Sequence, residues 1–575
     1  MNYVIIQPMQ KTWQRVNNVL TTHSGRVLAL LILLYVILFT AALAYKWETY
    51  QTGYDQTYFQ QPLWNTIQGR FMQQSDFNYS DSAFAVDFMP FLIAFVPFFW
   101  LVPSPHTLFF LESLILGLGA LPIFWLARAR LQNPVAALGL VLVYMLNPTL
   151  EYFNLLPFNL RASGLVLLLY AFYFFEKRRF WLFALCAGLA LLTRTEVSLV
   201  VAMFGLYGLL YNWSAHRRRV KKYPVHFWVV PLIAGLAYFV IVITYVLPLF
   251  IQPGTMVLPP SVTANGPVEL SQKQINYIAG SNTLVATNYG DLGQSLPEVL
   301  QNTLTHPDKT IQRVFTLKKF EYLLAMLLPF AFLSLFAPTL LVFALPILGL
   351  NLLSIRPSQY DYTTHYSALL LFPLTIGAIY GLANILSFLE KRQNSNRTQV
   401  NKRIIKNIRF LSPSHLRLLV ILSLMGAVGV AQIVEKNPLP GVIRYAEKHN
   451  VVANINKIIQ QIPLNASVTA TSLLGAHLQP RQYTYDFPLA LYQPPASAMQ
   501  YILLDTNAQA LYLPQNGEAL DGKVPIDFVQ HDGRWKLVAR YVVKDQLDRR
   551  QKQPREIQLW QNISPTTPSL LSAGK

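Results

Sequence analysis

The sequence predicts an α-helical polytopic membrane protein with about eleven transmembrane helices, a juxtamembrane segment and a small C-terminal α/β or α+β domain outside the membrane. Three observations predict this fold class. Apolar runs near 20 residues recur along the chain, and roughly 20 residues are needed to cross about 30 Å of hydrocarbon. Hydrophobic residues make up 53% of the chain, with mean hydropathy +0.33. Basic residues fill alternate gaps between the runs, as cytoplasmic loops do.

The apolar runs account for most of the predicted crossings. A signal peptide or a buried core would explain one such run but not a series. The stretch 181–211 lies between two basic loops, so we expect it to cross twice with a hairpin tip at 193–196. The stretch 323–353 is too long for one crossing, and we expect a break near Pro338. The runs occupy residues 26–45, 107–127, 134–152, 160–175, 227–250, 323–353, 366–389 and 418–434.

Residues 88–102 form an apolar piece that we do not expect to cross. The piece is short and contains Pro90 and Pro97. If the loop after the first helix is outside and Arg128 is inside, only one crossing fits between them. We therefore predict a juxtamembrane or re-entrant segment.

Charge then sets the predicted topology. The basic segments are expected inside, which places residues 1–25 and the loop 390–417 in the cytoplasm. The membrane domain is residues 26–434, with outer loops 46–106 and 251–320. The basic segments are 1–25, 128–130, 177–179, 217–222 and 391–417. They explain the net charge of +19, so we expect the lipid bilayer as a partner and no nucleic acid.

Residues 435–575 are predicted to form the extracytoplasmic C-terminal domain. Strand-like pieces at 501–504, 535–541 and 557–560, with a hairpin signal at Asp532-Gly533, indicate a small sheet. About 130 residues is an ordinary domain size.

Several chemistries have no basis in the sequence. The single cysteine, Cys186, permits neither an intrachain disulfide nor a CxxC metal site. No Gly-rich phosphate loop, GxSxG or HExxH motif is present, so ATP-driven transporters and soluble hydrolases lack their motifs. Matched halves with interrupted helices, typical of secondary transporters, are not evident.

Chemically unusual residues instead collect on the predicted outer side. This face is a candidate active site at the membrane surface, although loops are also polar simply because water surrounds them. The candidates are Asp55, Asp87, Arg161, Arg194, Glu196, Arg356, Tyr360 and His365.

The first outer loop carries a family resemblance. The run from Tyr54 to Asn65, followed by Gly69-Arg70, resembles the signature of bacterial predicted membrane proteins catalogued as domain of unknown function 2079. That family is similar to the C-type glycosyltransferase superfamily, which includes protein mannosyltransferases and the aminoarabinose transferase. The resemblance implies a bacterial inner (plasma) membrane location and a polyprenyl-phosphate sugar donor bound on the outer face.

The resemblance also implies roles for two residues. The acidic residue of the superfamily's first loop matches Asp55, and the basic residue of its hairpin tip matches Arg194. The chain departs from the family at three positions. Asp87 stands where the family usually has His, and Asn159 and Arg161 stand where it often has the His and Glu of a Phe-His-Pro-Glu sequence. A metal or acid/base role is therefore not carried over to these positions.

The required chemistry fits the same residues. Sugar transfer needs a carboxylate to take the acceptor's proton and a cation to hold the departing phosphate. Asp55 is the candidate base. Arg194 is the candidate phosphate ligand, because guanidinium binds phosphate bidentately, although it could equally reach the interface by snorkelling.

The other candidates have weaker assignments. Arg161 and Arg356 are alternative phosphate ligands, and Asp87 and Tyr360 are further substrate contacts. Glu196 near the bilayer should pair with Arg194, because an unpaired charge there is costly. His365 is a proton acceptor, a metal ligand or a hydrogen-bonded structural residue, and no metal ligand set is assigned.

Two functions from different classes stay open. The first is a glycosyltransferase-like enzyme that uses a polyprenyl-phosphate sugar, with or without a divalent cation. The second is a non-catalytic membrane protein, or a transporter of lipids or sugar-lipids, that retains the fold. Neither the sugar nor the acceptor follows from the sequence.

Overall fold

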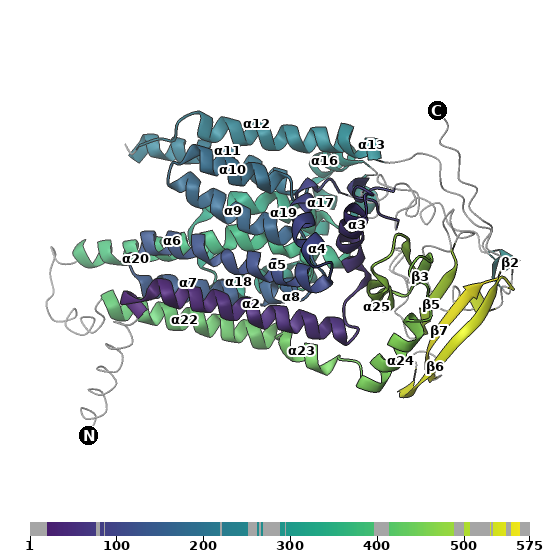
Figure 1. Cartoon of the computed structure of the whole chain (residues 1–575). Coiled ribbons are helices and arrows are strands. Elements are labelled where there is room, and N and C mark those ends of the chain that lie inside the picture. Colours follow the sequence, from purple (N-terminus) through teal and green to yellow (C-terminus); the bar gives the residue numbers. More distant parts are fainter. Residues whose placement is uncertain are drawn as a thin grey trace, which may run out of the picture.

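A bundle of helices carries a small mixed sheet at one end (Figure 1). This architecture comes from a computed structural model. It describes residues 20–75, 81–85, 87–218, 221–250, 262–263, 266–267, 288–293, 295–395, 413–487, 499–506, 529–530, 533–547 and 554–563.

The helical domain runs from α2 to α22. Several of its helices begin with a proline after a polar cap: Ser104, Asn133 and Asn147 each accept a hydrogen bond from a backbone N–H of the first turn. The helices are α2 Ser24–Glu48, α3 Thr57–Ile67, α4 Val96–Leu101, α5 Pro105–Leu118, α6 Ala120–Leu131, α7 Pro134–Met145, α8 Pro148–Asn154, α9 Arg161–Glu176, α10 Phe180–Leu191, α11 Val197–Arg218, α12 His226–Ile241, α13 Leu247–Phe250, α16 Leu296–Thr305, α17 Pro307–Val314, α18 Leu317–Leu327, α19 Leu345–Leu353, α20 Leu371–Ser395 and α22 Pro413–Val434.

Several of these helices can cross a membrane. By length and composition, five qualify within the described ranges, and the bent pair α7 and α8 would make a sixth. The chain is thus a predicted membrane protein with several apolar helices, and the count of eleven crossings remains a prediction. The predicted non-crossing piece is the short helical segment Pro90–Leu101, which is shorter than a span.

The stretch 323–353 breaks earlier than expected. The chain leaves α18 through η6 (Leu328–Phe330), and Ala331 and Phe332 both adopt positive φ, 48° and 58°. Two short 3₁₀ helices, η7 (Leu333–Phe336) and η8 (Pro338–Ala344), then lead into α19. The break therefore lies several residues before Pro338, at a turn that the prolines alone do not mark. The hairpin predicted over 181–211 is formed by α10 and α11.

Three of the predicted cytoplasmic basic segments lie together at one end of the bundle, which we call the basic end. Arg130 pairs with Glu176, at the end of α9. Arg178, in the next turn, donates hydrogen bonds to the carbonyls of Lys222 and Lys221 at 2.7 and 2.8 Å. The other two segments, 1–25 and 391–417, lie mostly outside the described residues.

The opposite end, which we call the sheet end, carries the C-terminal domain. Its five strands have the order β4-β3-β5-β7-β6, with β3 parallel to β4 and β5, and β7 antiparallel to β5 and β6. Three of them, β5, β6 and β7, cover the three predicted pieces. The hairpin signal at Asp532 lies outside the described residues. The strands are β3 Val468–Ala470, β4 Thr484–Asp486, β5 Tyr501–Asp505, β6 Trp535–Leu547 and β7 Pro554–Asn562; the domain's longest helix is α24 His449–Ile459.

The loop that the sequence predicts as the first outer loop, residues 46–106, contacts this domain. The Tyr54 hydroxyl donates to the carbonyl of Thr484 at 2.9 Å, and the Gln61 side chain donates to the carbonyl of Gln482 at 2.8 Å. A Cβ at Gly475 would lie 2.5 Å from the ring of Tyr54, so this close approach requires glycine. The two segments are therefore held in one fixed arrangement.

Candidate functional site

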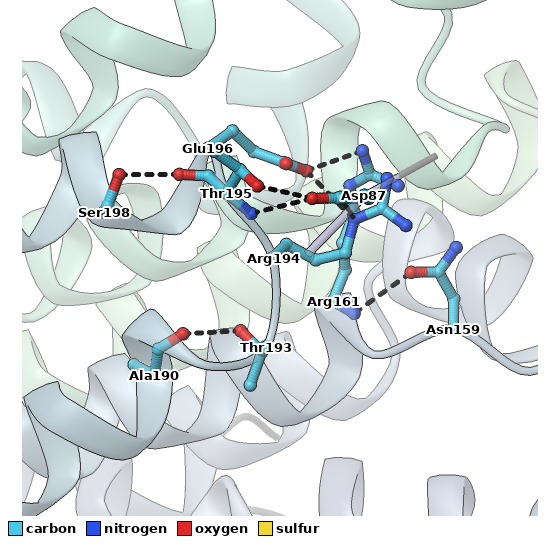
Figure 2. Close-up of polar contacts among 9 residues, drawn as sticks. All are labelled: Asp87, Asn159, Arg161, Ala190, Thr193, Arg194, Thr195, Glu196 and Ser198. Atoms are coloured by element: carbon cyan, nitrogen blue, oxygen red, sulfur yellow. Dashed lines mark hydrogen bonds and ion pairs between the residues drawn. The ribbon is translucent and has the colours of Figure 1, made fainter. Parts of the chain in front are cut away.

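The hairpin tip between α10 and α11 is the centre of the candidate site. Thr193 Oγ1 donates to the carbonyl of Ala190 at 2.7 Å, and Ser198 Oγ donates to the carbonyl of Thr195 at 2.6 Å. Both bonds are visible in Figure 2 and fix the turn at its two sides. A Cβ at Gly164 of α9 would lie 2.9 Å from Thr193 Oγ1, so glycine lets α9 pack closely against the tip.

Asp87 is held by this tip. Its Oδ1 accepts hydrogen bonds from Thr195, from N at 3.2 Å and from Oγ1 at 2.5 Å. Its Oδ2 lies 2.6 Å from Arg194 Nε. Figure 2 shows Asp87 enclosed by the tip and the arginines. The carboxylate is therefore fully engaged within the protein.

Glu196 pairs with Arg194, as expected, and more closely with Arg161. Its Oε1 lies 2.6 Å from Arg161 Nη2 and 3.7 Å from Arg194 Nε. Burial alone would raise the pKa of Glu196, but Arg161 and Arg194 more than offset this and lower it below its ordinary value. Two arginines and two carboxylates thus meet in alternating contact at the tip.

A third arginine, Arg356, extends the positive charge toward the surface. Its guanidinium carbon lies 6.0 Å from the ring centroid of Tyr366, and that of Arg161 lies 5.1 Å from the same ring. The His365 ring is tilted by 45° against the Tyr366 ring, with the centroids 4.2 Å apart. Arg356 is exposed, and within the described ranges no carboxylate forms an ion pair with it. Of the three arginines Arg161, Arg194 and Arg356, Arg356 is the one whose charge is available to a ligand.

Asp55 lies beside Arg356. Its side chain is exposed at the surface, yet the protein around it is extensive enough that desolvation raises the pKa of the carboxyl. The charge of Arg356 offsets part of this rise. Within the described ranges no group donates a hydrogen bond to the Asp55 carboxylate, so its oxygens are free to meet a ligand.

The neighbours of Asp55 in the signature segment have structural roles. Gln56 accepts a hydrogen bond from the Phe158 N–H at 2.9 Å, and Asn65 donates to the carbonyl of Gln73 at 2.9 Å. Together with Tyr54 and Gln61, they fasten the loop to the helices and to the C-terminal domain. Asp55 differs from these four residues in facing outward.

Tyr360 makes a different contact from the other candidates. Lys319 Nζ lies 4.8 Å from the centroid of its ring. The same amine donates to the carbonyls of Leu352 at 2.6 Å and Ser354 at 3.0 Å. This cation therefore fixes the end of α19 together with Ser354, two residues before Arg356. Tyr360 belongs to the same support.

Two residues of the site were not expected from the sequence. Tyr366 lies between two arginines, and Thr195 supplies two donors to Asp87. Tyr366 follows His365 directly, which was the only signal for it. Thr195 was marked only as part of the hairpin tip, and nothing indicated its bond to Asp87, because the two residues are 108 positions apart.

Metal binding finds no support at this site. Among the residues that the structure describes, no three His, Cys, Asp or Glu side chains are grouped so that they could hold a metal ion. Asp87 and Glu196 are instead paired with arginines. We therefore derive no step through a divalent cation.

Twelve chains of solved structures match this protein. One of them is the crystal structure of ArnT from Cupriavidus metallidurans bound to undecaprenyl phosphate, with 13% sequence identity and a TM-score of 0.41. The match covers 93% of this chain and 99% of that one. No curated protein matches the sequence.

A family model identifies the chain more directly. The model, described as "Predicted membrane protein (DUF2079)", matches residues 45–545 and so takes in the signature segment, the hairpin tip and most of the C-terminal domain. The resemblance carried by the first loop is confirmed by this match. The chain belongs to the DUF2079 family of predicted membrane proteins.

Proposed function

We propose that this protein transfers a sugar from a polyprenyl-phosphate donor to an acceptor at the sheet end of the membrane domain. The observation that carries the proposal is the exposed Asp55 carboxylate near Arg356, in a segment where Tyr54, Gln56, Gln61 and Asn65 form structural hydrogen bonds. The resemblance of this loop to C-type glycosyltransferases supports the same reaction class.

In the proposed reaction an acceptor hydroxyl oxygen attacks the anomeric carbon of the sugar. The hydroxyl proton passes to the Asp55 carboxylate as the new carbon–oxygen bond forms. The bond between the anomeric carbon and the phosphate oxygen breaks, and polyprenyl phosphate leaves with the electron pair. A cation near this oxygen stabilises the developing charge.

We assign the phosphate contact to Arg356 before Arg194. Arg194 is only 17% exposed and lies 2.6 Å from Asp87, so a phosphate would have to compete with an existing ion pair. Arg356 is exposed and has no such competitor among the described residues. In this assignment Arg161 and Arg194 add positive charge behind Arg356 and hold the hairpin tip.

The second candidate function is a non-catalytic protein that binds or moves a lipid or a sugar-lipid. The ion pairs favour it, because two of the three arginines are already neutralised by Glu196 and Asp87. Such a cluster of ion pairs would stabilise the hairpin tip without taking part in a reaction. In that case the protein would bind polyprenyl-phosphate sugars but release no polyprenyl phosphate.

The test replaces the proposed base in purified full-length protein supplied with a panel of polyprenyl-phosphate sugars. Asp55→Asn keeps the shape of the side chain and removes its basicity, so release of polyprenyl phosphate should fall by roughly 10²-fold or more. Donor binding, measured separately, should be retained. The matched control is Asp81→Asn, an exposed carboxylate of the same loop, which should change neither quantity.

Two results would contradict the assignment. Near-normal turnover of Asp55→Asn would remove Asp55 as the base. Binding of the panel by the unaltered protein with no turnover for any donor would favour the non-catalytic function. Arg356→Ala should weaken donor binding, and unchanged donor affinity would remove Arg356 as the phosphate ligand.

A further inference from the structure

A pocket of about 580 Å³ lies at the basic end of the helical domain. Arg178 and Arg179 form one wall, and Lys221 and His226 form the other. The pocket lies beyond the last residue of α9, whereas the candidate site lies at its first. Since α9 has 16 residues and rises about 1.5 Å per residue, the two sites are roughly 24 Å apart along the helix.

The walls of this pocket are joined to each other. Arg178 adopts a positive φ of 56°, and its guanidinium bonds to two carbonyls of the opposite wall. The same guanidinium lies 4.5 Å from the ring centroid of Tyr223. Tyr223 in turn donates a hydrogen bond to Glu176 at 2.9 Å. The pocket is therefore held in shape by the protein itself.

The floor of the pocket is a buried aromatic cluster. Phe227 lines the pocket and packs against Phe175 and Phe183, with ring centroids 5.5 and 6.3 Å apart. All three side chains are buried. A floor of this kind offers a ligand no polar partner, so the binding energy of a charged ligand must come from the walls.

The walls carry positive charge without a matching carboxylate. Among the described residues no Asp or Glu forms an ion pair with Arg178, Arg179 or Lys221. The nearby carboxylate, Glu176, is already engaged by Arg130 and by three tyrosine hydroxyls. The side chains of Arg179 and Lys221 are exposed. The pocket is thus suited to an anion.

The rim of the pocket identifies the source of that anion. Trp181 is 82% exposed, and Leu182, which also lines the pocket, is exposed too. Exposed Trp next to basic side chains is typical of the level of the lipid headgroups, and basic pockets between helices bind anionic headgroups. A small soluble anion would gain nothing from this apolar rim.

We infer that the pocket between the α9–α10 turn and the start of α12 binds the phosphate headgroup of an anionic phospholipid. Arg179 and Lys221 contact the phosphate, and Arg178 keeps the walls in place. The acyl chains lie along the exposed apolar face of α10. The site is independent of the proposed function, because it lies at the other end of the molecule.

The test measures phosphatidylglycerol binding to full-length protein in detergent by native mass spectrometry. Arg179→Gln combined with Lys221→Gln should weaken binding about thirtyfold, the scale expected for two basic side chains at a membrane surface. Phosphatidylcholine, which has no net charge, should bind weakly to both proteins. The matched control is Lys448→Gln with Lys457→Gln, two exposed lysines of the C-terminal domain.

Three results would overturn the inference. Unchanged phosphatidylglycerol binding in the pocket variant would remove the site. An equal loss of phosphatidylglycerol binding in the control variant would show that the effect comes from the overall charge of the protein. Displacement of the lipid by an equal concentration of inorganic phosphate would show a site for soluble anions instead. The melting temperature of each variant reports whether it is folded. If the double variant is unstable, Lys221→Gln alone repeats the test, and it should show about half of the double variant's loss of affinity on a logarithmic scale.

Discussion

The protonation of Asp55 depends on two opposing influences at the scale of single side chains. Desolvation raises the pKa of this carboxyl, and Arg356 lowers it again. A general base must be deprotonated to act, so its activity is present above its pKa and lost as the pH falls through it. The position of that loss should therefore depend on Arg356.

Replacing Arg356 with Gln should move the acid limb of the proposed transferase activity to higher pH. Without the neighbouring cation, the charged form of Asp55 loses its stabilisation and its pKa rises further. The measurement is kcat against pH at saturating donor, so that weaker donor binding does not enter. Lys448→Gln serves as control. If the acid limb does not move, Arg356 does not influence the pKa of the proposed base Asp55.

Single residues show where sequence reasoning succeeds and where it ends. It selected Asp55, Arg161, Arg194 and Arg356 for their chemical type and their predicted side of the membrane. It gave the ion pair of Glu196 with Arg194, at 3.7 Å, but not the closer one with Arg161, at 2.6 Å. Pairing depends on how the hairpin tip packs against α9, and residue spacing along the chain does not contain that information.

Among the elements, the pairing of β5 with β7 inside the C-terminal sheet depends on one buried arginine. Arg555 of β7 donates to Asp505 of β5, from Nε to Oδ1 at 3.0 Å and from Nη2 to Oδ2 at 2.5 Å. Its Nη1 lies 2.5 Å from Glu447, which precedes α24. A buried charge that loses its partner is costly, so each member of this triad holds the others in place.

Asp505→Ala should therefore destabilise β5 and β7 by about 3–5 kcal/mol. Glu556→Ala is the matched control, because it breaks an ion pair of the same sheet with Arg540, whose side chain is 54% exposed, and should cost less than about 1 kcal/mol. Amide hydrogen exchange in the full-length protein reports the local free energy of opening for each strand. Equal protection losses in the two variants would contradict this difference.

Element length decided which strands the sequence could predict. The pieces that became β5, β6 and β7 have five or more residues of strand-forming composition. Strands β3 and β4 have three residues each and pair in parallel, so they present no hairpin signal. The break after α18 was misplaced for a related reason, since it rests on the positive φ of Ala331 and Phe332 rather than on proline.

For the molecule as a whole, charge patterning predicted which loops share an end. Arg130, Glu176, Arg178 and Lys221 meet at the basic end, as alternate loops should. The candidate residues gather at the sheet end. The docking of the C-terminal domain on the first loop was not predictable in this way, because it rests on bonds between segments more than 400 residues apart.

Labelling of introduced cysteines should place the two ends on opposite sides of the membrane. In a Cys186→Ser background, Ser295→Cys at the start of α16 should react with an impermeant reagent added outside, and Ser395→Cys at the end of α20 only after permeabilisation. The physical reason is the retention of basic loops in the cytoplasm. Labelling of both positions from one side would invalidate the assignment of the ends.

The docked first loop also has a consequence for biosynthesis. Tyr54 and its partner Thr484 are 430 residues apart, and ribosomes add about 5–20 residues per second. The loop is therefore synthesised roughly 20–90 seconds before the strand that completes it. Until then Gln61 and Ser75 lack the carbonyls to which they donate. A chain cut short before Thr484 would leave this surface permanently open, and a membrane protease could distinguish unfinished from finished molecules by that loop alone.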